Sequence, residues 1–452
     1  MGHAAGIAAG ADVTLDLPDA AKNIAVFGET GTGKTTRVLN HLLVQALDLD
    51  CGALIFDVRG DFHQTVSRAA KLTGKTVQRV GVGGDGVLGL NLLAGLTADT
   101  AAGFLEAAFR LLGQGQGDSG FWVSLAVTRC RHALSVLQHV PDAYTLKALH
   151  RYVFEEPYRT QALATAQEAL AELQLRASEE GGQEADLTAR RLKASVEYEL
   201  TVAPSYADKE RSGLNRTIET ALARFTDPEL EDAFCAAGSA QADIADVLDG
   251  KVLVVNVPRE RFKAAAAVVY LFVKERFFQA LNARPSMDDG PRKTRPVLFF
   301  CDEYQQLCSP GDAHFFDTSR ALNVVGIVAS QSIEAYINAL GDEHAAGALL
   351  ANFANVIAFR STERTMRYVA GKLGEVEVWR EGYNAGKTDV GWFSATTNEG
   401  RSAALQRQTL LDPQIFRMLP PDRAVALLTV RGTAFDDVVI VPQITGDDLE
   451  CE

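Results

Sequence analysis

The stretch Asn23–Leu43, NIAVFGETGTGKTTRVLNHLL, constrains the fold of this chain more than any other. It reads as an apolar strand, a glycine-rich turn and an amphipathic helix. The turn Gly28–Thr35 satisfies the pattern G-x-x-x-x-G-K-[ST] of a phosphate-binding loop. Because the strand before the turn and the helix after it are both present, the stretch predicts binding of a nucleotide phosphate rather than a chance glycine turn.

Each part of this turn has a chemical task. The glycines let backbone N–H groups converge on the β-phosphate. Lys34 supplies a point charge to the β- and γ-phosphates, and Thr35 can place its hydroxyl on Mg²⁺. The helix that starts there presents the positive end of its dipole to the anion. ATP and Mg²⁺ are therefore the predicted cofactors. The predicted nucleotide-binding residues are Gly28, Thr30, Gly31, Thr32, Gly33, Lys34, Thr35 and Thr36.

Short apolar runs rich in β-branched residues recur along the chain, with helical-looking sequence between them. Their continuous rather than alternating hydrophobicity indicates strands that are covered on both faces, as in a mainly parallel sheet. The alternation of strand and helix predicts a doubly wound α/β domain. The runs are Ile24–Phe27, Ala53–Phe56, Val252–Val257, Val297–Cys301, Val324–Ala329, Val356–Phe359, Val425–Val430 and Val438–Val441.

The region 98–238 breaks this rhythm, because only helical periodicity is found in it. Two flexible interruptions, GQGQGDSG (Gly113–Gly120) and EEGGQEAD (Glu179–Asp186), divide it. We expect an all-α domain inserted into the α/β domain; the alternative is a helical decoration with no separate role. The expected division is an N-terminal segment 1–22, an α/β domain 23–97 and 239–447, the inserted domain 98–238 and an acidic tail 448–452.

Hydrolysis of a nucleotide also needs a carboxylate that holds magnesium and a group that orients or deprotonates the attacking water. The segment RPVLFFCDEYQQL offers both, because its apolar strand ends directly before Asp302 and Glu303. Ligands bind at the carboxyl ends of the strands in open α/β sheets. We expect Asp302 to hold Mg²⁺ together with Thr35, and Glu303 to polarise water. The alternative is that the two acids cap the following helix.

Three further residues stand near the ends of other predicted strands. Gln331 ends the run NVVGIVASQS, where a neutral amide can hydrogen-bond the γ-phosphate or the water and report whether the phosphate is present. Arg320 precedes this run and could reach the γ-phosphate of a neighbouring subunit as an arginine finger, and Arg360 is a second candidate for that role. Exposed residues without such a role are the alternative for all three.

The run IFDVRGDF (Ile55–Phe62) ends another strand with Asp57, Arg59 and Asp61 around a glycine. These groups should lie near the mouth of the phosphate-binding loop if the two strands are neighbours. A structural role in capping and turning the chain is as compatible with the sequence as a functional one.

Charge and cysteine content narrow the class of protein. The net charge of −14 argues against a protein that simply coats DNA. It is compatible with a ring that handles DNA, in which only a narrow channel needs positive charge. The six cysteines are scattered without a CxxC pair, which argues against a zinc site or a disulfide framework and favours a reducing cytosol.

Neither a membrane span nor a signal peptide is expected. The longest apolar run, AAAAVVYLFV, has about half of the roughly 20 residues that a transmembrane helix needs. The N-terminus has no basic region and only a weak apolar core. We therefore expect a cytoplasmic protein.

Together these segments resemble the coupling ATPases of conjugative DNA transfer and type IV secretion, which belong to a superfamily of hexameric ring DNA pumps with RecA-like motor domains. VFGETGTGKTTRV is similar to the phosphate-binding loop of that family, and ALIFDVRGDF to its second strand. VLFFCDEYQQL matches its Walker B strand, and NVVGIVASQSIEAY its glutamine motif. Further segments that resemble the family are LGLNLLAGL, DIADVLDGKVLVVNVP, ANFANVIAFRSTERTMRYVAGKLGE and LDPQIFRMLPPDRAVALL.

The resemblance implies a RecA-like P-loop motor domain with an inserted all-α domain, and a homohexamer with ATP at each subunit interface. The match with the family's motifs assigns Lys34 and Thr35 as phosphate and magnesium contacts, and Asp302 and Glu303 as the Walker B pair. It also assigns Gln331 as the sensor and Arg320 as the finger that acts in trans. The chain departs from the family in two ways. The usual N-terminal transmembrane helices are not visible, which indicates a truncated piece or a naturally soluble relative. The sequence Asp57-Val58-Arg59 replaces the common Asp-Pro-Lys.

The predicted function is an ATP-dependent, DNA-translocating motor of the coupling type, which delivers DNA, nucleoprotein or effector substrates to a conjugation or type IV secretion apparatus. The expected partners are DNA in a central channel and proteins of the secretion apparatus or the relaxosome, at the cytoplasmic face of the bacterial inner membrane. One alternative is a related ring ATPase for chromosome pumping, DNA processing or protein secretion. The other is a nucleotide-gated docking module without significant turnover, which has no need of a positioned base such as Glu303.

Overall fold

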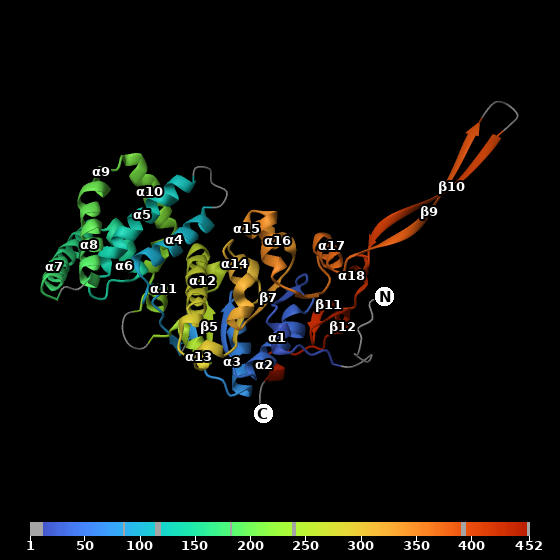
Figure 1. Cartoon of the computed structure of the whole chain (residues 1–452), viewed down its shortest axis with the longest axis horizontal. Coiled ribbons are helices and arrows are strands. Elements are labelled where there is room, and N and C mark those ends of the chain that lie inside the picture. The colour runs from blue at the N-terminus through green and yellow to red at the C-terminus, as the bar shows by residue number, and fades with distance from the viewer. Residues whose placement is uncertain are drawn as a thin grey trace.

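The computed structural model describes residues 12–84, 86–113, 119–180, 183–236, 241–389 and 395–449. At its centre lies a ten-stranded sheet in the order β12-β11-β8-β1-β7-β6-β2-β5-β3-β4, with helices on both faces (Figure 1). Its strands are β1 Ile24–Phe27, β2 Gly52–Asp57, β3 Val77–Gly81, β4 Val87–Leu88, β5 Val252–Asn256, β6 Val297–Cys301, β7 Val324–Ser330, β8 Asn355–Ala358, β11 Arg423–Val430 and β12 Thr433–Ile440. The predicted α/β class with a mainly parallel sheet is confirmed.

The direction of the strands changes only at one edge of the sheet. Neighbouring strands from β8 to β4 run parallel, whereas β11 is antiparallel to β8 and β12 is antiparallel to β11. All eight apolar runs predicted as strands belong to this sheet. The short strands β3 and β4 were missed, because they are only half-buried along most of their length and carry little apolar signal.

Successive residues of the central strands enter two different hydrophobic cores, one on each face of the sheet. In β1, Ile24 and Val26 pack into one core, whereas Ala25 and Phe27 pack into the other. A strand buried on both faces needs apolar residues at every position, which explains the continuous hydrophobicity of the sequence. The first core includes α2 Asn40–Leu47 and α3 Phe62–Leu72, and the second includes α12 Arg259–Asn282, α14 Asp312–Ser319, α15 Ile333–Leu340, α16 Glu343–Ala351 and α17 Glu363–Lys372.

The described residues between 98 and 236 form helices and no strand, and they lie at one end of the molecule (Figure 1). Their core continues without a break into the core on one face of the sheet; at the junction the rings of Phe104 and Phe272 lie 5.6 Å apart. The limits of the expected domains therefore stay predictions. Parts of the two expected interruptions, residues 114–118 and 181–182, lie outside the described residues. The helices are α4 Ala98–Leu112, α5 Ser119–Leu137, α6 Leu146–Phe154, α7 Glu156–Glu180, α8 Gln183–Glu197, α9 Ala203–Ser205, α10 Asp208–Leu222 and α11 Pro228–Phe234.

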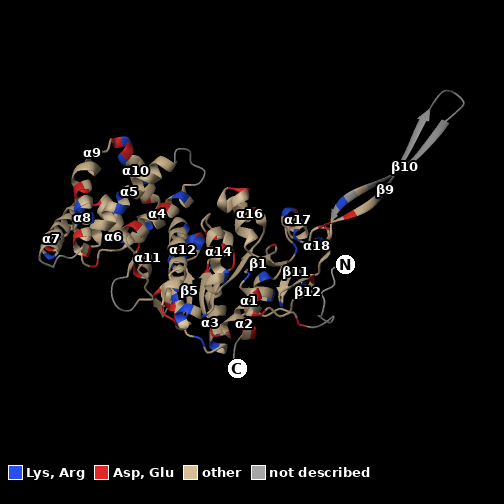
Figure 2. Ribbon diagram, in the orientation of Figure 1, with Lys and Arg blue, Asp and Glu red and all other residues tan. Residues whose placement is uncertain are grey.

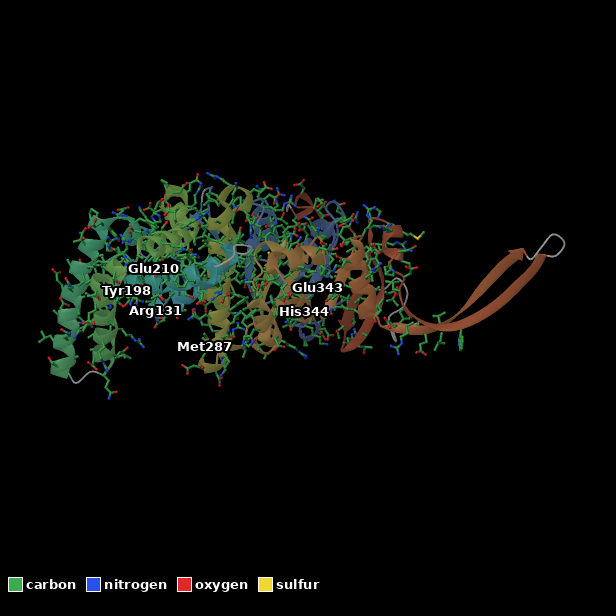
Figure 3. The ribbon with its side chains drawn as sticks, turned by 90° about the horizontal axis from the view of Figure 1, so that it is seen from above. Arg131, Tyr198, Glu210, Met287, Glu343 and His344 are labelled. Atoms are coloured by element: carbon green, nitrogen blue, oxygen red, sulfur yellow. The ribbon has the colours of Figure 1, made fainter. Side chains whose placement is uncertain are left out.

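A long antiparallel hairpin, not predicted from the sequence, projects from the opposite end of the molecule (Figures 1 and 3). It consists of β9 Glu375–Asp389 and β10 Ala395–Thr409. Described side chains at its base are exposed, including Trp379 at 69%. Val376 and Val378 alternate with glutamates in β9, but both are exposed, so this short alternation does not mark a strand of the buried sheet.

Short helices complete the described chain: α1 Leu17–Ala20, α13 Pro291–Thr294 and α18 Ile415–Met418. Acidic and basic side chains are interspersed along the ribbon (Figure 2). Among the described helices, none has the length and apolarity that a membrane crossing would require. Of the expected N-terminal segment and acidic tail, residues 1–11 and 450–452 lie outside the described residues.

Candidate nucleotide-binding and catalytic site

The glycine-rich turn after β1 has the backbone shape that a phosphate cradle requires. Gly31 and Gly33 have φ angles of +81° and +89°, which L side chains rarely adopt. A π-helical turn, Lys34–Leu39, leads from there into α2. Lys34 is buried, and its Nζ donates to the carbonyl oxygens of Gly28 at 2.6 Å and Glu29 at 3.3 Å. Burial lowers the pKa of this ammonium group. The ammonium group of Lys34 is therefore held inside the loop by backbone carbonyl oxygens, largely shielded from water.

The structure brings the phosphate-binding loop and the acid pair together from opposite ends of the sequence. The hydroxyl of Thr35 donates to Oδ2 of Asp302 at 2.8 Å. Asp302 is buried, and its Oδ1 accepts the backbone N–H of Glu303 at 3.0 Å. Loss of hydration raises the pKa of Asp302, which the hydrogen bond from Thr35 partly offsets. A hydroxyl and a carboxylate side by side are the hard oxygen donors that Mg²⁺ prefers, so these residues fit the expected ion.

Glu303 occupies a backbone conformation that is unusual for a residue other than glycine. Its φ and ψ are 60° and 44°, in the left-handed region. Such conformations persist where the surrounding structure fixes them, and they are concentrated at functional sites. Nε2 of Gln331 lies 3.4 Å from both carboxylate oxygens of Glu303, and Nε2 of Gln305 lies 2.5 Å from Oε2. The predicted sensor thus contacts the predicted base, and Gln305 is a neighbour that no motif indicated.

The two candidate arginine fingers lie at opposite ends of the central parallel strands, Arg320 before β7 and Arg360 after β8. Arg320 is exposed and lies before β7, whereas Gln331 follows the same strand. One strand of this length separates them by roughly 20 Å. Arg320 is therefore remote from the site of its own chain. Arg360 follows β8 directly beside the phosphate-binding loop, where its Nε lies 3.3 Å from Oε2 of Glu29 and its carbonyl accepts the N–H of Glu29. Arg360 thus belongs to the site of its own chain.

The strand that carries Asp57 is not a neighbour of β1, since β7 and β6 lie between them. The condition under which this segment was expected at the mouth of the phosphate-binding loop is therefore not met. The buried carboxylate of Asp57 accepts from the N–H groups of Gly60 at 2.7 Å and His63 at 2.9 Å, and from Nδ1 of His63 at 2.8 Å. These bonds build the turn. Arg59 and Asp61 are exposed, and Nη2 of Arg59 lies 3.7 Å from Oδ2 of Asp61.

Two family models match the chain. One, described as the central domain of helicase HerA, matches residues 2–259, and the other, described as the TraM recognition site of TraD and TraG, matches residues 296–421. Among solved structures, the chain is similar to the bacterial conjugative coupling protein TrwB in its unbound form, with 16% identity over 96% of this chain and 88% of that chain and a TM-score of 0.60.

The complex of TrwB with ADP and Mg²⁺ shares 15% identity over 94% of this chain and 87% of that chain, with a TM-score of 0.62. The complex with a non-hydrolysable ATP analogue has a TM-score of 0.60 at 15% identity and covers 95% of this chain and 86% of that chain. At such identities the likeness shows a shared fold. The RecA-like P-loop fold with an all-α part, implied by the sequence motifs, is thereby confirmed. A comparison with curated protein sequences found no match.

Proposed function

The chain belongs to the family of the HerA helicase central domain and is therefore an NTPase, and from this premise we propose that it is an ATP-driven motor that moves DNA. The proposal extends to the coupling type, which delivers its substrate to a conjugation or type IV secretion apparatus. Both family models and the fold of TrwB agree with that resemblance. The observation that carries the proposal is the contact between Thr35 and Asp302 next to Glu303 and Gln331, since a hydrolytic site requires these groups together.

In the proposed mechanism each side chain has a separate task. Lys34 presents its ammonium group to the β- and γ-phosphates of ATP. Thr35 and Asp302 would hold Mg²⁺, which when bound neutralises part of the phosphate charge. Glu303 orients the attacking water and accepts its proton. Because the amide of Gln331 reaches the Glu303 carboxylate, a γ-phosphate that competes for this amide would alter the environment of the base.

Completion of the site by a second copy is part of the proposal. Arg320 lies too far from the phosphate-binding loop of its own chain, so its guanidinium would act on the γ-phosphate of the neighbouring subunit in a homohexameric ring. A mixture of inactive Lys34→Ala and Arg320→Ala proteins should then regain activity, because some interfaces combine an intact lysine with an intact arginine. Glu303→Gln is the matched control: Glu303 belongs to the same site as Lys34 of its own chain, so a mixture of Glu303→Gln and Lys34→Ala contains no complete site and should stay inactive. No recovery in the first mixture would contradict a finger in trans.

The proposed substrate is DNA, threaded through the centre of the ring, with relaxosome or secretion-apparatus proteins as partners at the cytoplasmic face of the inner membrane. The match to the TraM recognition site supports a relaxosome partner. The acidic net charge of −14 restricts DNA contact to a local surface rather than the whole exterior.

Steady-state ATPase activity with and without single- and double-stranded DNA, alongside mass measurement of the assembly, tests the proposal. We expect DNA to stimulate hydrolysis, and Glu303→Gln to lower kcat by about 100-fold or more while nucleotide binding is retained. Hydrolysis that does not respond to DNA would favour a ring ATPase that moves protein. Absence of hydrolysis with DNA, at concentrations where hexamers form, would favour a nucleotide-gated docking module.

A further inference from the structure

A buried ion pair contacts the turn that follows Glu303 and joins two helices that lie side by side on one face of the sheet (Figure 1). Lys274 of α12 and Asp312, the first residue of α14, have no exposed side-chain surface, and Nζ lies 2.6 Å from Oδ1. The ammonium group also donates to the carbonyl oxygen of Leu307 at 2.9 Å and to Oγ of Ser309 at 3.0 Å. Its three protons are thus all used within the protein.

The carboxylate of this pair is equally well satisfied. Asp312 accepts the backbone N–H of Ser309 at 2.9 Å and the hydroxyl of Ser309 at 2.7 Å. It also accepts the hydroxyl of Tyr304. A buried pair of charges contributes little net stability compared with apolar side chains of similar volume, because both charges lose their hydration. The cluster is therefore better explained by the geometry that it fixes than by stability.

The cluster fixes the backbone next to Glu303, the residue that precedes Tyr304. Tyr304 is fully buried and directly follows Glu303, whose φ of 60° places it in the left-handed region. Leu307 and Cys308 donate their N–H groups to the carbonyl oxygen of Tyr304, so the turn after Glu303 is closed on itself. The ion pair forms hydrogen bonds to this turn at three points. Asp312 accepts the hydroxyl of Tyr304, and Lys274 donates to the carbonyl oxygen of Leu307 and to the hydroxyl oxygen of Ser309.

We propose that Lys274 and Asp312 are positioning residues of the ATPase, which hold the Glu303 backbone in its left-handed conformation through the hydroxyl of Tyr304. Neither residue touches the phosphate-binding loop, so they act only through the turn. The inference rests on the proposed function, since it assigns Glu303 as the base. When the hydrogen bonds from the ion pair to this turn are lost, the carboxylate of Glu303 leaves its position next to Gln331. The loop that binds the nucleotide stays intact.

Tyr304→Phe is the decisive variant, because it removes one oxygen atom between Asp312 and the turn. Tyr336→Phe is its matched control. Tyr336 is a buried tyrosine in the same core, its ring lies 6.2 Å from that of Tyr304, and its hydroxyl has no hydrogen-bond partner among the described residues. Both substitutions leave an intact apolar core.

We expect Tyr304→Phe to lower kcat by about ten- to a hundredfold, the range that displacement of a catalytic group produces. The KM for ATP and the affinity for ADP should stay within about twofold of the wild type, because Lys34 and Thr35 are unaffected. Tyr336→Phe should keep the wild-type kcat. The double variant Lys274→Met/Asp312→Leu, which fills the same space without charge, should recover most of the stability that Lys274→Met alone loses, and should lose turnover to the same extent as Tyr304→Phe.

A Tyr304→Phe kcat equal to that of Tyr336→Phe would overturn the inference, and so would full activity in the double variant. A purely structural cluster predicts that outcome, with changes confined to Tm. Failure of the proposed function looks different: the wild-type protein itself would not hydrolyse ATP in the presence of DNA. Assays run well below the Tm of each variant separate lost turnover from unfolding.

Discussion

Replacement of Thr35 by valine removes the hydroxyl that joins the phosphate-binding loop to the acid pair and keeps the size and branching of the side chain. In the structure this hydroxyl donates to Oδ2 of Asp302 at 2.8 Å. A hydrogen bond to a charged group contributes about 1.5–3 kcal/mol, which corresponds to about 10- to 150-fold in an equilibrium constant. If the same hydroxyl is a ligand of Mg²⁺, the gain in ADP affinity on adding Mg²⁺ should shrink by a factor in this range. ADP affinity without Mg²⁺ should change little.

The assay is the fluorescence anisotropy of a labelled ADP, titrated with protein in excess Mg²⁺ and in EDTA, between pH 5 and 8. The pKa of Asp302 is raised by burial, so in the wild type the Mg²⁺-dependent gain should fall with decreasing pH above the ordinary range of an aspartate. In Thr35→Val the carboxylate loses a donor that favours its charged form, so this fall should begin at a higher pH than in the wild type.

Thr36→Val is the matched control for this experiment. Thr36 lies next in the loop, and its carbonyl oxygen accepts the N–H of Ile444 at 2.7 Å, which the substitution leaves in place. No side-chain hydrogen bond of Thr36 is found in the described part of the chain. Thr36→Val should therefore retain the Mg²⁺ effect. An undiminished Mg²⁺ effect in Thr35→Val, or an equal loss in both variants, would refute the assignment of the Thr35–Asp302 pair as the metal site.

Three further predictions concern stability and the loop. Lys274→Met leaves the carboxylate of Asp312 buried without its cation, so urea unfolding should show a loss of about 3–5 kcal/mol, most of which Lys274→Met/Asp312→Leu should restore. Burial raises the pKa of Glu199 to about 7 from 4.5, despite Arg129 at 3.0 Å, so the folded state binds a proton more tightly than the unfolded chain. The free energy of unfolding should therefore fall by roughly 2–3 kcal/mol between pH 5 and pH 8, and urea titrations should show this fall in the wild type but not in Glu199→Gln. Gly33→Ala forces a φ of +89° on a residue with a Cβ, so it should cost about 1–2 kcal/mol of loop stability and weaken ADP binding in isothermal titration calorimetry.

Several expectations depended on which strands and residues are neighbours in space, and the sequence alone does not show this. The segment with Asp57 was expected at the mouth of the phosphate-binding loop only if its strand adjoined β1, and the strand order places β7 and β6 between them. The hairpin β9–β10 was not predicted, since the apolar residues at its base, such as Val376 and Val378, are exposed and form no part of the cores that cover the other strands. The sequence did not show that Arg360 lies beside the phosphate-binding loop, because this follows from the pairing of β8 with β1.

The sequence by itself determined the elements whose pattern is local. A strand buried on both faces must be apolar throughout, and a loop that wraps a phosphate must carry glycines and a lysine at fixed spacing, so β1, β6, β7 and Lys34 could be identified from neighbouring residues alone. Only the tertiary structure decided which of these elements meet. The 2.8 Å bond between Thr35 and Asp302 joins residues 267 positions apart, and the ion pair of Lys274 with Asp312 has no motif at all. Such contacts depend on the order of the strands and on the packing of helices over them, and that arrangement belongs to the whole folded chain rather than to any one segment.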